Sequence, residues 1–311
     1  MRVSVIVCTR NRRAELTRVT ESLYAQTQIP DEYIVIDGSD ESVKGDDDFK
    51  EKFSAINSQV ELIYEFSKPG LTRQRNLGVK LATGDILFFF DDDIVLDSDF
   101  LQEMKKIFQC KSEYMGGMGN IIESANRSIK SRSKRFYNMI FCLENDRTKG
   151  KFKASGMANK PHGNPRFVKT EFLSGGLTGY RKEIFSEFEF DETVSGYSYF
   201  EDADFSRRVS QKYSLFYNPK ARCRHLQAEG GRGDLRENRK KFLLNYRYFF
   251  FKNFYRENRL YIVAHWWSIV GIFLKEIAQL PVKYNVSIEK IRGYLQGLKG
   301  FSEKRAFFGI K

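Results

Sequence analysis

Two groups of acidic residues are the part of this sequence best suited to carry chemistry. The first group, Asp91-Asp92-Asp93, directly follows the apolar run 86–90. Three neighbouring carboxylates repel one another, so a bound cation is the simplest way to stabilise them, and hard oxygen ligands favour Mg²⁺ or Mn²⁺. A solvated acidic turn is the structural alternative. The position of the triplet at the end of a buried strand favours the metal site.

The second acidic group, Glu201-Asp202-Ala203-Asp204, stands near the start of a helix predicted over 198–212. Adjacent carboxylates raise each other's pKa, and one of them beside an acceptor hydroxyl would serve as a general base. Acidic residues also stabilise the first turn of a helix, so a purely structural role is the alternative. His225 follows a predicted strand downstream of this group. A lone histidine is more often a satisfied surface or core group, but this position makes it a candidate for the site.

The elements that must position these residues belong to an α/β fold. Apolar runs predict strands at 3–8, 33–37, 60–64 and 85–90, with helices between them over 14–26 and 71–82. Apolar strands that alternate with helices indicate a mostly parallel sheet covered on both faces. Ligands of such sheets bind beyond the carboxyl ends of the strands. Polar groups suited to a nucleotide stand at three of these ends: Thr9-Arg10-Asn11, Asp37-Gly38-Ser39 and the acidic triplet.

The middle of the sequence is less regular. Residues 125–170 are basic and loop-rich, and a long loop inside a compact domain is usually functional. We therefore expect an insertion near the acceptor side of a site. Gly175 and Gly176 follow within the run 172–179, and glycines allow a tight turn or a close approach of the backbone to a ligand.

The net charge of +12 is concentrated at the end of the chain. Residues 222–311 hold 19 Lys and Arg against 7 Asp and Glu, whereas residues 1–221 are neutral. This predicts a catalytic domain joined to a region that meets an anionic membrane, an acidic glycan or nucleic acid. The apolar run 260–274, with Trp266 and Trp267 at its centre, is shorter than the roughly 20 residues that span a bilayer. It is either a packed core helix or an interfacial helix on anionic lipids.

The cysteines and the first residues bear on the compartment. The four cysteines form no CxxC pair, and the sequence begins directly in strand-like residues without a signal-like apolar run. Both features predict a reducing, cytoplasmic environment, with the cysteines as core fillers. Lipid binding by the apolar run would add peripheral attachment to the inner face of the cell membrane.

Five segments, in their order and spacing, resemble the inverting glycosyltransferases of family 2. They are 5–12 (VIVCTRNR), 35–39 (VIDGS), Arg75-Asn76, 89–93 (FFDDD) and 201–205 (EDADF). The resemblance extends over about residues 1–230. It implies a GT-A fold, a nucleotide-diphospho-sugar donor with UDP-sugars favoured, Mn²⁺ or Mg²⁺, and inversion at the anomeric carbon. It also implies an acceptor hydroxyl on a glycan or a lipid-linked molecule, in the synthesis of cell-surface polysaccharide or glycolipid.

By matching position, the resemblance implies roles for single residues. The residues implied to contact the nucleotide are Thr9, Arg12, Asp37, Arg75, Asp91 and Asp92, with Asp91 nearer the ribose. The residues implied to contact the metal are Asp93 and His225. Asp202 would be the general base. The residues implied to lie on the acceptor side are Gly175, Gly176 and Glu201.

These inferences predict a GT-A domain over 1–230, divided at about residue 110 into nucleotide-binding and acceptor parts, and a helical, basic region over 231–311. That region lacks the multiple long spans of processive synthases. A sugar-nucleotide nucleotidyltransferase is the alternative enzyme, but the glycine-rich phosphate loop that such enzymes carry is missing after the first strand. A basic nucleic-acid-binding module is the non-enzymatic alternative. Its acidic groups would repel phosphate unless they bound metal, and no nucleic-acid motif is present, so we expect no nucleic-acid partner.

Overall fold

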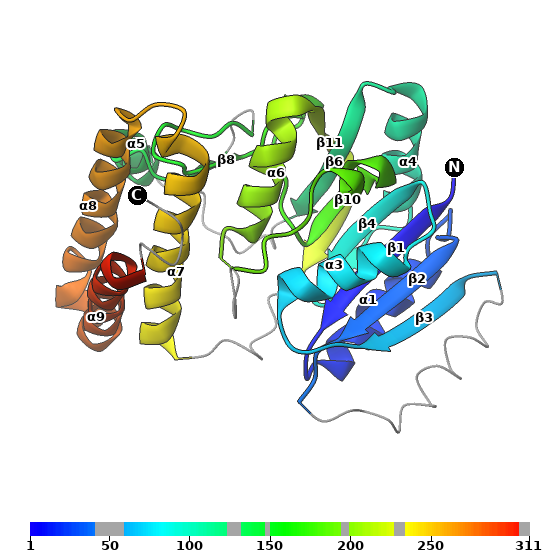
Figure 1. Cartoon of the computed structure of the whole chain (residues 1–311), viewed down its shortest axis with the longest axis horizontal. Helices are drawn as coiled ribbons and strands as arrows, with labels where there is room; N and C mark the ends of the chain where they lie inside the picture. Colours follow the sequence, from blue (N-terminus) through cyan, green and yellow to red (C-terminus); the bar gives the residue numbers. More distant parts are fainter. Residues whose placement is uncertain (41–58, 123–131, 147–149, 194–198, 227–233, 305–311) are drawn as a thin grey trace. The chain divides into compact units, whose positions relative to one another are not determined.

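The computed structural model describes residues 1–40, 59–122, 132–146, 150–193, 199–226 and 234–304 (Figure 1). The chain divides into two compact units. Unit 1 comprises Met1–Arg127, Pro161–Gly196 and Glu201–Gly231, and unit 2 comprises Ser128–Lys160, Tyr197–Phe200 and Arg232–Lys311. From the sequence we assigned residues 128–160 to the acceptor part of a 1–230 domain, whereas their contacts group them with the C-terminal helices. The roles of the two parts stay a prediction.

Unit 1 is built on one sheet, in which the described residues form nine strands in the order β3-β2-β1-β4-β10-β6-β11-β5, with β9 beside β11. The strands are β1 (Val3–Thr9), β2 (Glu32–Asp37), β3 (Glu61–Phe66), β4 (Ile86–Asp91), β5 (Ile94–Leu96), β6 (Tyr114–Ile122), β9 (Val168–Thr170), β10 (Leu177–Arg181) and β11 (Ser214–His225). The four predicted strands become β1 to β4, which pair in parallel. Strand β10 pairs antiparallel with both its neighbours. The predicted α/β fold with a mostly parallel sheet is confirmed.

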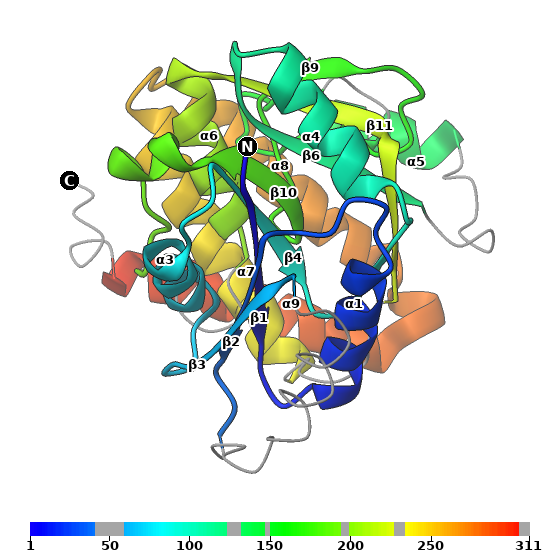
Figure 2. The ribbon, with the colours of Figure 1, turned by 90° about the vertical axis from the view of Figure 1, so that its right-hand side faces the viewer.

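Helices cover both faces of this sheet. They are α1 (Arg13–Tyr24), α3 (Leu71–Leu81), α4 (Phe100–Cys110) and α6 (Glu201–Lys212), with a short 3-10 helix η1 (Lys182–Ser186). Because successive side chains of a strand point to opposite faces, Val5 and Val7 of β1 pack in the core under α1 and α4, while Ile6 packs in the core that contains Phe205 of α6. Figure 2 shows α1 and α3 on opposite sides of β1 and β2. The sheet is therefore buried on both faces, as its apolar strands require.

Unit 2 is mainly helical. Its elements are α5 (Arg132–Ile140), β7 (Asn145–Asp146), β8 (Asn159–Lys160), α7 (Leu235–Phe250), the π-helical turn η2 (Phe251–Tyr255), α8 (Tyr261–Ile277) and α9 (Leu280–Lys304). Asp234 caps α7 by accepting a hydrogen bond from the backbone N–H of Glu237. Helix α5 lies in the segment that we expected to be loop-rich. None of the helices described by the structure has the length and apolar content that crossing a membrane requires.

A buried polar group lies in the core of unit 2. The ring of His265 is fully buried and stacks on Phe250, with centroids 3.9 Å apart. Its Nδ1 lies 3.3 Å from the carbonyl oxygen of Ser155, which also accepts a hydrogen bond from the hydroxyl of Tyr246. Burial lowers the pKa of His265 to about 3. The imidazole is therefore neutral in the folded protein, and Nδ1 carries its proton toward the carbonyl.

Because His265 is buried in its neutral form, we predict that unit 2 loses stability in acid. The folded-state pKa of about 3 lies below the ordinary value, so the unfolded chain takes up a proton first, and stability is lost as pH falls below about 6.5. For one such group the loss between pH 7.5 and pH 5 is about 2 kcal/mol. We expect His265→Phe, which keeps the ring stack, to remove this part of the pH dependence.

Denaturant unfolding at both pH values measures the effect. The two tryptophans of the chain, Trp266 and Trp267, lie in α8, so tryptophan fluorescence follows unit 2 alone. Equal pH dependence in the wild-type and variant proteins would contradict the assignment.

Candidate functional site

The acidic triplet forms the turn that joins β4, which ends at Asp91, to β5, which begins at Ile94. Arg12 lies beside two of its carboxylates, 3.0 Å from Asp92 and 3.8 Å from Asp93. Asp92 accepts hydrogen bonds from the hydroxyl of Thr9 at 2.8 Å and from Arg12 at 3.0 Å. Burial raises the pKa of Asp92 to about 6, although both partners oppose the shift. Thr9 and Arg12, which we expected at the nucleotide, are thus held at the triplet through Asp92.

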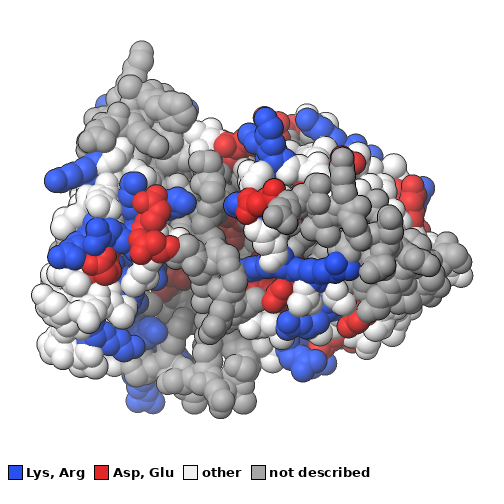
Figure 3. All heavy atoms as spheres, turned by 90° about the horizontal axis from the view of Figure 1, so that it is seen from below, with Lys and Arg blue, Asp and Glu red and all other residues white. Residues whose placement is uncertain are grey.

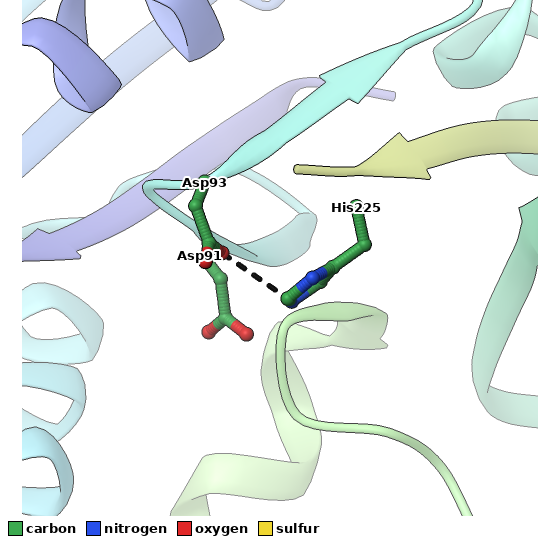
Figure 4. Close-up of side chains that lie close together, drawn as sticks. All are labelled: Asp91, Asp93 and His225. Atoms are coloured by element: carbon green, nitrogen blue, oxygen red, sulfur yellow. Dashed lines mark ion pairs between the residues drawn. The ribbon is translucent and has the colours of Figure 1, made fainter. Parts of the chain in front are cut away.

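Asp91, Asp93 and His225 form a group that could hold a metal ion. Their donor atoms all lie within 4.8 Å of one another, and the Nε2 of His225 lies 3.3 Å from Oδ1 of Asp93 (Figure 4). The register of the sheet explains the meeting, because His225 ends β11 and pairs with Ile94 at the start of β5. The two carboxylates suit Mn²⁺ or Mg²⁺, and the imidazole is a ligand typical of transition metals. The structure brings together the two metal residues predicted from the sequence and adds Asp91.

A buried arginine lies beside this group. Arg75 of α3 is 3% exposed, with Nη1 2.9 Å from Glu201 and Nη2 3.6 Å from Asp91. Burial by itself would lower the pKa of Arg75, but Glu201 and Asp91 more than offset it and the pKa is raised. Burial also raises the pKa of Asp91, and burial together with the adjacent Asp202 raises the pKa of Glu201 to about 8. Arg75 therefore lies between two carboxyl groups, and its positive charge opposes the rise in the pKa of each.

In the second acidic group, Asp202 and Asp204 have different kinds of partner. The Oδ2 of Asp202 accepts a hydrogen bond from the backbone N–H of Gly175 at 3.2 Å, and Oδ1 accepts one from Ala203 at 2.7 Å. Both partners are backbone groups, so Asp202 has no ion pair among the described contacts. Asp204 is 2% exposed and bonds to Arg208 one turn along α6, at 2.9 Å. Asp204 thus has the structural role, and Asp202 is left facing the Gly175 loop.

Gly175 and Gly176 are required by close packing on these charged groups. A Cβ atom on Gly175 would lie 2.8 Å from Nη1 of Arg75, and one on Gly176 would overlap the carboxylate of Asp91. The loop is also tied to β4, because the backbone N–H of Asp91 donates to the carbonyl of Gly176 at 3.1 Å. The glycines that we predicted for the acceptor side therefore contact the metal group and the general-base candidate directly.

Asp37 lies at the same edge of the sheet, one strand away. In the parallel register Thr9 pairs with Asp37 across β1 and β2. Asp37 is 2% exposed and accepts hydrogen bonds from the hydroxyl of Tyr64 at 2.8 Å and from the backbone N–H of Ser39 at 2.8 Å. Tyr64 on β3 was missed in the sequence, since only the pairing of β3 with β2 shows that its side chain reaches Asp37.

The crowding at Gly176 generates a test of the metal group. We expect Gly176→Ala to displace the Asp91 carboxylate and to weaken Mn²⁺ binding at least about tenfold, as the loss of a group that positions a ligand does. The measurement is titration with Mn²⁺ followed by calorimetry or by the spin resonance of the free ion.

The matched control is Gly300→Ala in α9, where the added methyl would make only ordinary contacts, at 3.5 Å or more, with Leu244. It should bind Mn²⁺ as the wild type does. Wild-type affinity in Gly176→Ala, or equal losses in both variants, would show that Asp91 is not a ligand.

Comparison with known proteins agrees with this geometry. The family model described as glycosyl transferase family 2 matches residues 4–188. A glucosyl-dolichyl phosphate glucuronosyltransferase of Haloferax volcanii is 28% identical over 148 residues, which cover 46% of this chain and 46% of that protein. The match therefore spans about half the length of this curated relative. An uncharacterized glycosyltransferase of Bacillus subtilis, YwdF, is 25% identical over 248 residues, covering 78% of this chain and 82% of that protein.

Two solved structures share the fold. One is GalNAc-T7 with UDP, GalNAc and Mn²⁺, with a TM-score of 0.60 and 15% identity over 100% of this chain and 58% of that chain. The other is the mannosyltransferase PcManGT from Pyrobaculum calidifontis in complex with GDP-Man and Mn²⁺. It has a TM-score of 0.57 and 15% identity over 96% of this chain and 87% of that chain. The fold of this chain is the GT-A fold of these glycosyltransferases.

Proposed function

This chain belongs to glycosyl transferase family 2, and from that premise we propose that it moves a sugar, with inversion, from a nucleotide-diphospho-sugar to the hydroxyl of a glycan or a lipid-linked acceptor. The observation that carries the proposal is the meeting of three kinds of group at one sheet edge. Asp37 and Thr9 suit a nucleoside, while Asp91, Asp93 and His225 suit a cation. Asp202 suits a base, and it contacts the Gly175-Gly176 loop that packs on Asp91.

The donor half of the site would hold the nucleoside diphosphate. Asp93, His225 and Asp91 are the proposed ligands of the metal, and a bound Mn²⁺ or Mg²⁺ would offset the charge that builds up on the leaving diphosphate. We propose that Asp37 binds the base or ribose and that Arg12 and Arg75 add fixed positive charge beside the phosphates. Asp92 holds Thr9 and Arg12 in place. The structures with UDP and with GDP-Man support a nucleotide-sugar donor, and UDP is our proposal for the nucleotide.

The acceptor half would supply the base. Asp202 takes the proton from the acceptor hydroxyl while that oxygen attacks the anomeric carbon and the bond to the diphosphate breaks on the opposite face. A single displacement of this kind inverts the configuration. Glu201 is the neighbouring carboxyl group, but it is paired with Arg75 at 2.9 Å. Asp202, which has only backbone partners among the described contacts, is therefore the better base.

If Asp202 is the general base, replacing it should slow sugar transfer and leave donor binding unchanged. We expect Asp202→Asn to lower kcat by about 10²- to 10⁴-fold, because general-base catalysis contributes that much, while the stabilisation of the protein by UDP-sugar and Mn²⁺ stays near the wild-type value. Asp204→Asn is the matched control, since Asp204 bonds to Arg208. It should lower the melting temperature and keep turnover. Near-normal turnover in Asp202→Asn would refute the assignment.

The donor and metal assignments are tested together by a thermal-shift screen of UDP-, GDP- and TDP-sugars. We expect a UDP-sugar to raise the melting temperature only when Mn²⁺ is present, because the diphosphate needs its charge offset beside Asp91 and Asp93. Asp93→Ala should abolish the shift. Transfer that survives EDTA in the wild-type enzyme would overturn the metal proposal, and a shift with GDP-sugars alone would overturn the choice of UDP.

We place the enzyme at the inner face of the cell membrane, in the synthesis of cell-surface polysaccharide or glycolipid, attached peripherally. The basic excess of the chain favours an anionic surface. On the face in Figure 3, Lys and Arg form several separate groups with Asp and Glu among them.

A further inference from the structure

Helix α8 exposes an apolar stripe. Apart from Lys275, its exposed side chains are all large and apolar, at positions that fall on one face of a helix: Val263, Trp266, Trp267, Val270, Leu274 and Ile277. Val263 is 69% exposed and both tryptophans are more than 40% exposed. Large apolar side chains in an unbroken stripe are unusual on a surface helix and mark a site that meets another apolar phase.

The opposite face of α8 carries the polar residues. His265, Ser268 and Glu276 are buried in unit 2. Ser268 lies 2.6 Å from the hydroxyl of Tyr246, and Glu276 accepts from Lys290 of α9 at 3.1 Å. An ordinary surface helix turns its apolar side inward and its polar side to water. Ile269 and Ile272 are also buried in the core of unit 2, so α8 is apolar on both faces, and its outer stripe is not explained by the packing of unit 2.

Helix α5 extends the stripe. The indole N–H of Trp267 donates to the carbonyl of Ile140 at 2.8 Å, and the hydroxyl of Tyr137 donates to the carbonyl of Gly271 at 2.6 Å. These bonds fix α5 beside α8, and α5 has three exposed apolar side chains of its own, Phe136, Met139 and Ile140. We name these three residues and the six of the α8 stripe together the α5–α8 face.

The charges around this face are positive. Helix α5 begins with Arg132, Lys134 and Arg135 and contains no acidic residue, and α8 contributes Lys275. The one acidic residue of α8 is Glu276, which is buried against Lys290. Apolar and aromatic side chains bordered by cations match the interface of an anionic bilayer, where Trp also concentrates. A second copy of the chain would bring these like charges together, which disfavours dimer formation through the face.

We propose that the α5–α8 face docks flat on an anionic lipid surface, with its tryptophans and aliphatic side chains among the lipid head groups and the basic residues of α5 on the lipid phosphates. The ring of Trp266 is held on this face by the guanidinium of Arg247, which lies 4.8 Å from the ring centroid. The inference rests on the proposed function, which includes peripheral attachment to the membrane, and it names the surface that makes the attachment. It gives a lipid-linked acceptor a reason to be near the enzyme.

The test is flotation of the full chain with two kinds of vesicle, one of phosphatidylcholine and one of equal parts phosphatidylcholine and phosphatidylglycerol. We expect flotation with the anionic vesicles only, together with a blue shift of tryptophan fluorescence and quenching by brominated lipid. Trp266 and Trp267 are the tryptophans of the chain, so this signal reports the face itself. No flotation, or flotation without a change in fluorescence, would overturn the proposal.

Variants assign the binding to named residues. The pair Phe136→Ser and Val263→Ser should weaken binding at least about tenfold, since each removes most of an exposed apolar side chain from the lipid. Arg132→Glu with Lys134→Glu should weaken it by at least about fivefold per cation, with the effect lost in high salt. Ile122→Ser and Lys105→Glu in unit 1 are the matched controls and should bind as the wild type does. Equal losses in the controls would overturn the assignment to this face.

Two further readouts separate the outcomes. Sedimentation without lipid should show a monomer. A dimer that Val263→Ser abolishes would show that a second copy of the chain, and not a bilayer, covers the face. The docking variants should keep transfer to a water-soluble acceptor, whereas Asp202→Asn should float normally without transfer. Docking and sugar transfer can therefore fail independently, and each failure is recognised by its own assay.

Discussion

The site depends on the buried guanidinium of Arg75. Moving a charged group out of water costs several kcal/mol even after the protein relaxes, so a side chain that is 3% exposed needs anionic partners close by. The carboxyl groups that it meets are those of Glu201, 126 residues later in the chain, and of Asp91. Helix α3, strand β4 and helix α6 are thereby joined at one point, and the same join sets where Asp202 stands relative to the metal group.

The carboxylates of the acidic triplet are stabilised by contacts with basic side chains. Asp91 lies beside Arg75, Asp92 pairs with Arg12, and Asp93 lies between Arg12 and the imidazole of His225. From the sequence, a shared cation was the simplest way to stabilise three crowded carboxylates, and in the structure Arg75 and Arg12 already offset part of their repulsion. What remains for an ion is the space between Asp91, Asp93 and His225, where the developing charge of a leaving diphosphate would also need to be balanced.

Sequence patterns predicted the part of the fold in which local rules dominate. Apolar strands alternating with helices gave β1 to β4, and the strand-end rule placed Thr9, Asp37 and Asp91 at one edge. Contacts between distant segments could not be predicted in this way. Tyr64 reaches Asp37 only through strand order, and the Gly175-Gly176 loop lies on Asp91 only because β10 pairs with β4. Helix α8 was also ambiguous, since an apolar run alone does not reveal which of its faces is buried.

The overlap between Gly176 and Asp91 has a consequence for how such an enzyme could change over time. Any side chain at position 176 claims space already filled by the carboxylate of Asp91, so a larger residue there becomes tolerable only after position 91 is shortened. That shortening would itself remove a proposed metal ligand and a partner of Arg75. The two positions are therefore epistatic, and neither can vary alone. We therefore expect changes in sugar or acceptor preference to arise at other positions of the site.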